Sequence, residues 1–297
     1  MDRKRTIVFV IIAIATLFLS FCHNSGKYEI SNTNNFSDNP LWTYKSSEAI
    51  SATPEIDDQR VFLRTHTSVI ALDIQTGKII WRATSQGDRP LSPSPKVFGN
   101  YLIVPEVASG IAVFDTNSGT LVWRIPGIDI AKSQHLTAHI RSITSADNEL
   151  VYVVRFDWAL TAYELKTGRV VWEQRFSDRA LPYLSSNTDV VYLALGKTLR
   201  AFDAIQGDLI WEMSTDGYWG PIFVYKNILY AIDEARLSLQ AINLKTQEII
   251  WKEYYPAAKK YEARCLSVSN DLLYFTSQRL FAVSLDMTCL EKYTQVK

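Results

Sequence analysis

Short apolar runs alternate with polar turns along the chain, and one combination of runs and turns recurs. Its first copy reads Ala-Leu-Asp-Ile-Gln-Thr-Gly-Lys-Ile-Ile-Trp over residues 71–81. Two β-rich apolar runs flank a short polar turn, which is the pattern of a β-hairpin. The Asp can accept hydrogen bonds from turn amides, and the Gly can adopt the positive φ that closes such a turn. The stretch therefore predicts one strand, turn and strand.

The same spacing of a small residue, an acid or amide, a glycine and a tryptophan recurs along the chain. The four complete copies are Ala71, Asp73, Gly77 and Trp81; Val113, Asp115, Gly119 and Trp123; Ala162, Glu164, Gly168 and Trp172; and Ala201, Asp203, Gly207 and Trp211. A fifth copy keeps Ala241 and Trp251 but has Gln247 in place of the glycine, and a sixth, from Ala282, has lost the tryptophan. Counted from Trp42, the tryptophans lie 39, 42, 49, 39 and 40 residues apart. A period near 40 residues with several short strands is typical of propeller blades.

A tryptophan at one offset in five copies predicts a pocket that is repeated five times. Burying one indole ring removes roughly 150–250 Å² from water. At about 25 cal/mol/Å² this is a gross gain of about 4–6 kcal/mol, which is an upper bound. A lone hairpin cannot form such a pocket, so neighbouring copies must pack on each other.

The pattern predicts an all-β fold, a β-propeller of about six four-stranded blades. In the first unit we expect strands near 49–56, 60–65, 69–73 and 78–83. Six such units leave Leu41-Trp42-Thr43-Tyr44 as a surplus strand, and the sixth copy lacks the residues of a docking strand. We therefore expect the N-terminal strand 41–45 to form the outer strand of the last blade and to close the ring, which removes an exposed edge.

The copies resemble the tryptophan-docking repeat of the quinoprotein (PQQ-like) β-propellers. There the tryptophan stacks between the first-position Ala of its own copy and the Gly peptide of an adjacent copy. The resemblance covers nearly all of residues 41–297 and implies that Val113 replaces the alanine in the second copy. It implies docking roles for Trp42, Ala71, Gly77, Trp81, Gly119, Trp123, Ala162, Gly168, Trp172, Ala201, Gly207, Trp211, Ala241 and Trp251. Such repeats also build propellers without a cofactor, so the resemblance says more about fold than about activity.

The amino terminus predicts export. A basic start is followed by an apolar run from Thr6 to Cys22, which resembles a secretory signal. The run ends Leu-Ser-Phe-Cys, similar to a bacterial lipobox in which Cys22 is lipidated, although Phe21 stands where Gly, Ala or Ser is usual. An uncleaved membrane anchor and ordinary signal cleavage stay open as alternatives; at 17 residues the run is marginal for spanning a bilayer.

The predicted organisation has three parts. Residues 1–22 form the leader, residues 23–40 a polar, Asn/Ser-rich flexible tether, and residues 41–297 the propeller. Beyond Cys22, only Cys265 and Cys289 remain. An oxidising compartment would permit their pairing, but we place them at opposite edges of one blade, about 14 Å apart and beyond disulfide reach, which favours two separate thiols.

Charge and motifs argue against several functions. The chain has 31 basic and 31 acidic residues and a net charge of +0, so there is no electrostatic reason to expect a nucleic-acid partner. His135 and His139 are spaced as a helical metal pair, but Leu136 stands where His-Glu-x-x-His needs its glutamate. There is no Gly-x-Ser-x-Gly, no phosphate-binding glycine loop and no Cys-Cys pair of the kind that quinoprotein dehydrogenases carry. We predict no catalytic residue, no metal and no cofactor.

A contact surface is expected on the propeller face that carries the interblade loops, opposite the Asp/Thr/Gly turns. Aromatic residues mixed with arginine have the composition of protein-contact hot spots. The candidates are Arg141, Trp158, Tyr183, Tyr218, Trp219, Tyr254, Tyr255 and Tyr261. The alternative is that these aromatic residues simply cover the ends of the blades.

The leader, tether and repeat together are similar to the lipoprotein family of the outer-membrane β-barrel assembly machinery. That family has more blades than the six expected here. The resemblance implies a non-enzymatic envelope scaffold, anchored to a membrane, that presents interblade loops to a protein partner, and it points to outer-membrane protein assembly as the process. Two alternatives stay open: a PQQ- or other small-molecule-dependent enzyme, and a carbohydrate-binding or sensor propeller that uses Trp158, Tyr218 and Trp219 as stacking platforms.

Overall fold

The computed structural model consists of β-strands joined by short turns. It describes residues 40–86, 94–106, 110–127, 142–145, 149–155, 157–236, 238–254, 265–269, 272–276 and 280–284. Within these ranges there are 23 strands. The expected leader 1–22, nearly all of the expected tether 23–40, and His135, His139, Cys289, Arg141, Tyr255 and Tyr261 lie outside the described residues.

The strands form six antiparallel sheets, each a simple meander in chain order. The first three sheets are β1 (Glu55–Ile56), β2 (Arg60–Arg64), β3 (Ser68–Asp73) and β4 (Ile79–Thr84); β5 (Lys96–Phe98), β6 (Tyr101–Pro105), β7 (Ile111–Asp115) and β8 (Leu121–Ile125); and β9 (Ser142–Ser145), β10 (Leu150–Val154), β11 (Ala159–Glu164) and β12 (Val170–Arg175). The next two are β13 (Pro182–Ser186), β14 (Val190–Leu195), β15 (Thr198–Asp203) and β16 (Leu209–Ser214), and β17 (Trp219–Tyr225), β18 (Ile228–Asp233), β19 (Ser238–Asn243) and β20 (Ile249–Tyr254). The sixth has three described strands, β21 (Cys265–Ser269), β22 (Leu272–Thr276) and β23 (Leu280–Ser284).

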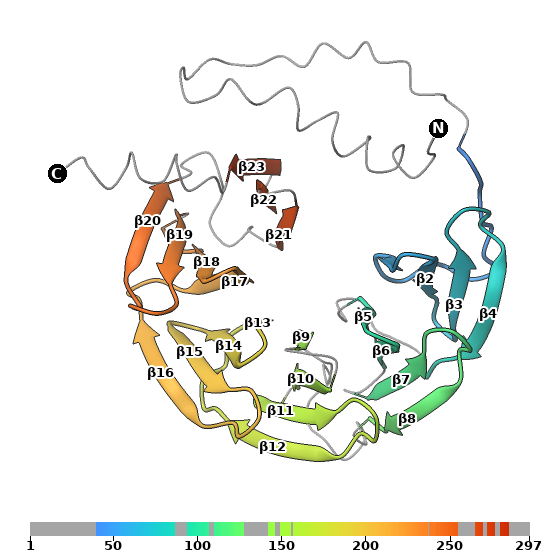
Figure 1. The fold of residues 1–297 in the computed structure, drawn as a ribbon, viewed down its shortest axis with the longest axis horizontal. Coiled ribbons are helices and arrows are strands. Elements are labelled where there is room, and N and C mark those ends of the chain that lie inside the picture. Colours follow the sequence, from blue (N-terminus) through green and yellow to red (C-terminus); the bar gives the residue numbers. More distant parts are fainter. Residues whose placement is uncertain are drawn as a thin grey trace, which may run out of the picture.

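The sheets are arranged as the blades of a propeller around a central axis (Figure 1). The first strands β5, β9, β13, β17 and β21 lie nearest the axis, and the fourth strands β4, β8, β12, β16 and β20 lie on the outside. The all-β propeller predicted from the repeat is confirmed. Cys265 lies on the innermost strand of the last sheet, as expected.

Each docking copy forms the hairpin between the third and fourth strands of a blade. In the second blade, the Asp115 carboxylate accepts hydrogen bonds from the backbone N–H groups of Asn117 (3.0 Å) and Ser118 (2.8 Å) and from the Ser118 hydroxyl (2.9 Å). Gly119 closes the turn with a φ of 70°. These bonds favour the ionised carboxylate, so they lower the pKa of Asp115, with the Ser118 amide making the largest contribution.

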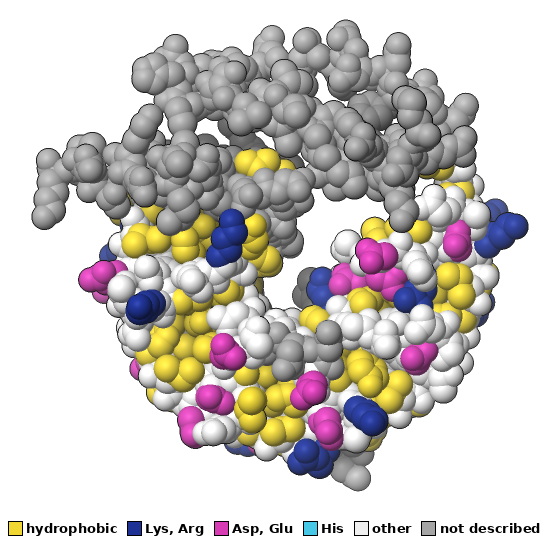
Figure 2. Space-filling model, in the orientation of Figure 1, with side chains coloured by type: hydrophobic (Ala, Val, Ile, Leu, Met, Phe, Trp, Pro, Cys, Tyr) yellow, Lys and Arg dark blue, Asp and Glu magenta, His cyan; other side chains and the backbone are white. Residues whose placement is uncertain are grey.

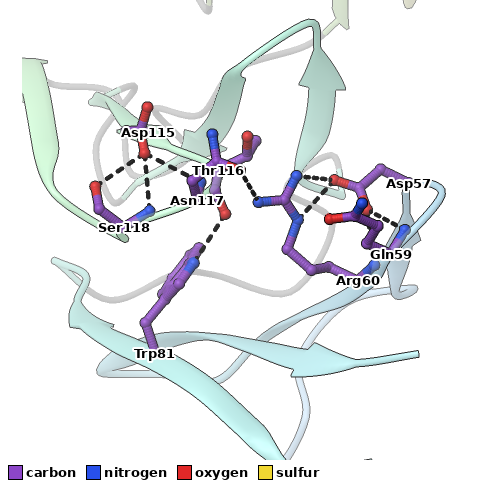
Figure 3. A network of polar contacts seen from close by, with 8 residues as sticks. All are labelled: Asp57, Gln59, Arg60, Trp81, Asp115, Thr116, Asn117 and Ser118. Atoms are coloured by element: carbon purple, nitrogen blue, oxygen red, sulfur yellow. Dashed lines mark hydrogen bonds and ion pairs between the residues drawn. The ribbon is translucent and has the colours of Figure 1, made fainter. Parts of the chain in front are cut away.

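The tryptophans of the first three hairpins reach the turn of the next blade. Trp81 faces Ala71 across its own sheet, and a β-bulge follows at that point. Its ring lies over Gly119, and its Nε1 donates to the Thr116 carbonyl at 2.9 Å (Figure 3). Arg60 reinforces the same seam, because its guanidinium contacts both Asp57 of its own blade and Asn117 of the next (Figure 3).

The same contact is made at three further seams. The ring and glycine pairs are Trp42 with Gly77, Trp123 with Gly168, and Trp172 with Gly207; the carbonyls that accept from the indole N–H are those of Ile74, Leu165 and Ala204. The fifth turn has Gln247 instead of glycine and still adopts a φ of 62°. Trp211 and Trp251 are half-buried and pack against the seams of their blades. The turn conformation therefore persists where the glycine is lost.

The core lies between the blades rather than within any one of them. Five apolar clusters each join two successive sheets, for example Trp81 of the first blade with Leu102 and Val104 of the second. A sixth cluster joins the first blade to Trp42 and Tyr44. Each blade is thus stabilised by its neighbours, as the repeated tryptophan predicted.

Two expected strands differ from the structure. Residues 41–45 carry no strand pairing, and the last sheet contains only β21, β22 and β23 among the described residues, so the expected ladder between 41–45 and that sheet is not made there. The segment is held instead by side chains, since Trp42 and Tyr44 pack on the first blade. The strand expected over 49–56 is reduced to Glu55–Ile56 and one bridge at Ile50, because Pro54 cannot donate a ladder hydrogen bond.

Lys, Arg, Asp and Glu side chains are interspersed among apolar ones on the face seen in Figure 2. No broad patch of one sign covers the described atoms of this view. In the part of the chain that the structure describes, no helix is long and apolar enough to cross a bilayer.

Candidate functional site

The two faces of the propeller carry different connections. The hairpins that join the second and third strands of each blade, and the loops that lead to the next blade, share one face, which we call the loop face. The Asp/Thr/Gly turns lie on the other face. The alternation follows directly from the meander order of the strands.

A cavity of about 310 Å³ opens on the loop face between the fourth and fifth blades. It is formed by two interblade loops and two hairpins. Its lining residues are Ala180, Leu181, Gly196, Tyr218, Trp219 and Glu234. Aromatic rings, aliphatic carbons and one carboxylate therefore meet in the same concave space.

Backbone hydrogen bonds hold the interblade loop against both hairpins. Trp219 N donates to the Gly196 carbonyl at 2.8 Å, and Glu234 N donates to the Tyr218 carbonyl at 2.8 Å. Gly220 leaves room for the Glu234 stem, because a Cβ at this position would lie 2.7 Å from Glu234 Cγ. Gly217 does the same for the Asp233 carboxylate. The two glycines allow this acidic hairpin to pack closely against the loop.

Glu234 is the charged group of the cavity. It is 9% exposed, and Tyr183 donates its hydroxyl to Glu234 Oε1 at 3.1 Å. Burial raises the pKa of Glu234, the Tyr183 hydrogen bond opposes the shift, and the neighbouring Asp233 adds to it. A carboxylate in this setting favours either a proton or a bound cation.

The aromatic candidates gather around this cavity to different degrees. Tyr218 and Trp219 line it, and Tyr183 contacts it through Glu234. Tyr218 is 43% exposed, but Trp219 is only 3% exposed. Trp219 therefore forms part of the cavity wall, and the expectation that it is an exposed stacking platform was wrong. Trp158, at a φ of 63°, packs, as Ala180 does, against the apolar cluster between the third and fourth blades, and Tyr254 is exposed at the end of β20.

The sequence interpretation missed Glu234, Gly196 and Gly220. Glu234 follows the second strand of its blade, as Glu106 follows the second strand of the second blade. Aligning the ends of the second strands across the copies would have singled out these two acids. The contact between Gly220 and Glu234 depends on strand register, which the repeat spacing does not contain.

No group of three or more His, Cys, Asp or Glu residues within the described ranges is placed to hold a metal ion. His66 is exposed after β2.

A family model matches the part of the chain that carries the docking repeat. The family model described as outer membrane protein assembly factor BamB matches residues 15–127 and 65–287, which is most of the chain. The chain belongs to this family. The resemblance inferred from the docking repeat is thereby confirmed.

A solved structure supports the BamB-family fold. The crystal structure of BamB from Moraxella catarrhalis superposes with a TM-score of 0.61 at 19% sequence identity and covers 80% of this chain and 72% of that one. At this identity the likeness shows the propeller fold alone.

Two enzymes are also similar in sequence. Tetrathionate hydrolase of Acidithiobacillus ferrooxidans is 22% identical over 245 residues, which is 73% of this chain and 47% of the enzyme. Quinohemoprotein alcohol dehydrogenase ADH IIB of Pseudomonas putida is 25% identical over 162 residues, 49% of this chain and 23% of the enzyme. The chain thus spans less than half the length of these two curated relatives.

Proposed function

We propose that this protein is a non-enzymatic scaffold of the cell envelope that presents its loop face to a protein partner in outer-membrane protein assembly. The observation that carries the proposal is the cavity between the fourth and fifth blades, where the exposed side chains of Tyr218 and Leu181 line the same space as the buried Glu234. Tyrosine is enriched among protein-contact hot spots, and exposed apolar side chains that lie together mark interaction surfaces. The match to the BamB family supports the choice of partner class.

Membrane attachment through Cys22 belongs to the same proposal. The apolar run that ends at Cys22 and the polar stretch after it fit a lipid anchor and a spacer. Mass spectrometry of the mature amino terminus is expected to find a lipidated Cys22, and Cys22→Ser is expected to release the protein from membranes. An intact leader, or cleavage at another bond, would replace the lipid anchor by a membrane span or by a soluble exported form.

The partner surface can be tested by site-specific photocrosslinking in the native host. A photoreactive phenylalanine analogue at Tyr218 reports on the loop face, and the same analogue at Ile205 is the control, since Ile205 is 70% exposed in a turn on the opposite face. We expect a crosslink from position 218 to a component of the outer-membrane assembly machinery and none from position 205. Equal labelling from both positions, or none from 218, would count against the scaffold proposal.

An enzymatic role is the second candidate, because the two curated relatives are enzymes. A quinone cofactor bound along the propeller axis would be its simplest form. Titration calorimetry with pyrroloquinoline quinone and calcium, followed by dye-linked oxidation of alcohols, tests it directly. Measurable quinone binding with turnover would favour the enzyme over the scaffold.

A further inference from the structure

Two blades carry a glutamate at the same structural position, but its carboxylate has different hydrogen-bond and ion-pair partners in each. Glu106 follows β6 and is 1% exposed. Arg124 grips its carboxylate with Nε at 2.8 Å and Nη2 at 3.1 Å, and Gln86 N donates to it at 2.8 Å. Two parallel bonds from one guanidinium are a strong way to neutralise a buried carboxylate. In the second blade the charge of Glu106 is therefore neutralised by an arginine of the same blade.

The fifth blade has the glutamate without the arginine. Arg124 directly follows the docking Trp123, and the residue that follows Trp251 is Lys252. Lys252 is directed elsewhere, since its Nζ lies over the Tyr254 ring at 5.2 Å from the centroid. Among the described residues, no Lys or Arg forms an ion pair with Glu234, whose hydrogen-bond donor is the Tyr183 hydroxyl.

The surroundings of Glu234 suit a cation on an apolar stem. Lys197 Nζ lies 5.9 Å from the centroid of the Tyr218 ring, near the outer limit of a cation–π contact, so the attraction for a further cation has to come from Glu234 itself. Leu181 and Ala180 add aliphatic wall. The Trp219 indole N–H is buried and has no acceptor among the described residues, which leaves it able to donate to a carbonyl that enters with the ligand.

We propose that the Glu234 cavity binds an arginine side chain of the protein partner, whose guanidinium repeats in trans the contact that Arg124 makes with Glu106 in cis. The proposal rests on the scaffold function above and gives it a chemical anchor point. Guanidinium fits better than ammonium because its planar fork can bond both carboxylate oxygens and also stack on a ring. A lysine provides only a point charge.

The test uses the full-length protein in mild detergent, labelled with 5-fluorotryptophan. The Trp219 resonance is assigned by its loss in Trp219→Phe. The probes are three blocked tripeptides with a central arginine, lysine or citrulline, of which citrulline is the neutral isostere of arginine. We expect the arginine peptide to shift the Trp219 resonance and to bind at least about tenfold more tightly than the citrulline peptide.

Variants separate the cavity from general electrostatics. Glu234→Gln keeps the shape of the side chain and is expected to weaken arginine-peptide binding at least about tenfold. Asp216→Asn is the matched control, because Asp216 is 88% exposed in the same loop region and pairs with Arg236; it is expected to change binding less than about twofold. Thermal unfolding of both variants checks that they fold.

The dependence on pH gives an independent readout. Arginine needs the ionised carboxylate, and the pKa of Glu234 is raised by burial, so affinity is expected to rise as pH rises through that pKa. The other charged or titratable groups beside it are Asp233 on the same hairpin, Tyr183 on β13, Lys197, and the pair Asp216 with Arg236. Glu234→Gln should abolish the pH dependence.

Each outcome has one meaning. Tighter binding of arginine than of lysine and citrulline upholds the proposal, and equal binding of arginine and lysine overturns it, because the guanidinium would then make no contact that an ammonium cannot make. Equal binding of arginine and citrulline, or full binding by Glu234→Gln, overturns it. Because the peptides are tested on purified protein, a failure here leaves the crosslink from position 218 as a separate test of the scaffold function, and the reverse also holds.

Discussion

Gly119→Ala is the sharpest test of how the blades are joined. Gly119 adopts a φ of 70°, and a Cβ built on it would lie 2.5 Å from Cδ2 of the Trp81 ring. A single methyl group therefore meets two obstacles, an unfavourable backbone conformation and a ring that fills the space. The ring cannot withdraw easily, because the Trp81 Nε1 bond to Thr116 fixes it.

The two obstacles have separate magnitudes. A non-glycine residue in the left-handed region costs about 1–2 kcal/mol. Forcing a methyl group into a packed seam costs about another 1–3 kcal/mol. Gly196→Ala isolates the first term, since Gly196 has a φ of 62° but its Cβ would meet only Ala180 Cβ at 3.5 Å, an ordinary contact. We expect a loss of about 2–5 kcal/mol at Gly119 and about 1–2 kcal/mol at Gly196.

Urea unfolding followed by circular dichroism measures both variants. A double-mutant cycle with Trp81→Ala then isolates the contact: without the ring, Gly119→Ala should cost no more than Gly196→Ala does, which gives a coupling energy of about 1–3 kcal/mol. Equal losses at Gly119 and Gly196, or zero coupling to Trp81, would refute the view that the ring and the glycine peptide form the seam.

Three further variants test single features. Asp115→Asn should keep the turn, because Asn243 accepts the same kind of bond in its own turn, but the variant should lose less stability on acidification than the unmodified protein. The pKa of Asp115 is lowered in the fold, so the stabilisation by its carboxylate is present above about pH 4 and is lost as pH falls through the lowered pKa. Melting temperatures of the two proteins at pH 7 and at low pH measure the difference. Arg124→Ala should lower the free energy of unfolding by about 3 kcal/mol, because it leaves the Glu106 carboxylate buried without its ion pair. Arg175→Ala breaks only exposed ion pairs and should lower it by less than about 1 kcal/mol in the same urea assay. Gln247→Gly should stabilise the fold by about 1 kcal/mol because it relieves a φ of 62°; a lower urea midpoint would contradict this.

The parts of the fold that the sequence predicted are those that repeat locally. Trp81 and Gly119 are each recognisable within their own copy, and the period alone indicates that one copy must reach the next. The cavity was only half predicted. Tyr218 could be chosen by its residue type. Glu234 comes from a hairpin of the fifth blade, and only the strand register shows that it lines the cavity and forms no ion pair with a described Lys or Arg.

Trp42 shows how far the repeat logic extends beyond regular strands. It lies on Gly77 and donates to the Ile74 carbonyl at 3.1 Å, as the other docking tryptophans do at their seams, yet residues 41–45 form no ladder. If docking alone holds this segment, Trp42→Ala should lower the free energy of unfolding. The loss should be smaller than the value of about 3–5 kcal/mol that is typical of a fully buried Trp, because Trp42 is half-buried whereas Trp81 is only 8% exposed. Urea unfolding of Trp42→Ala beside Trp81→Ala measures the two costs. A cost near zero would mean that the amino-terminal segment only rests on the first blade, and a cost equal to that of Trp81→Ala would mean that it closes the propeller as fully as an outer strand does.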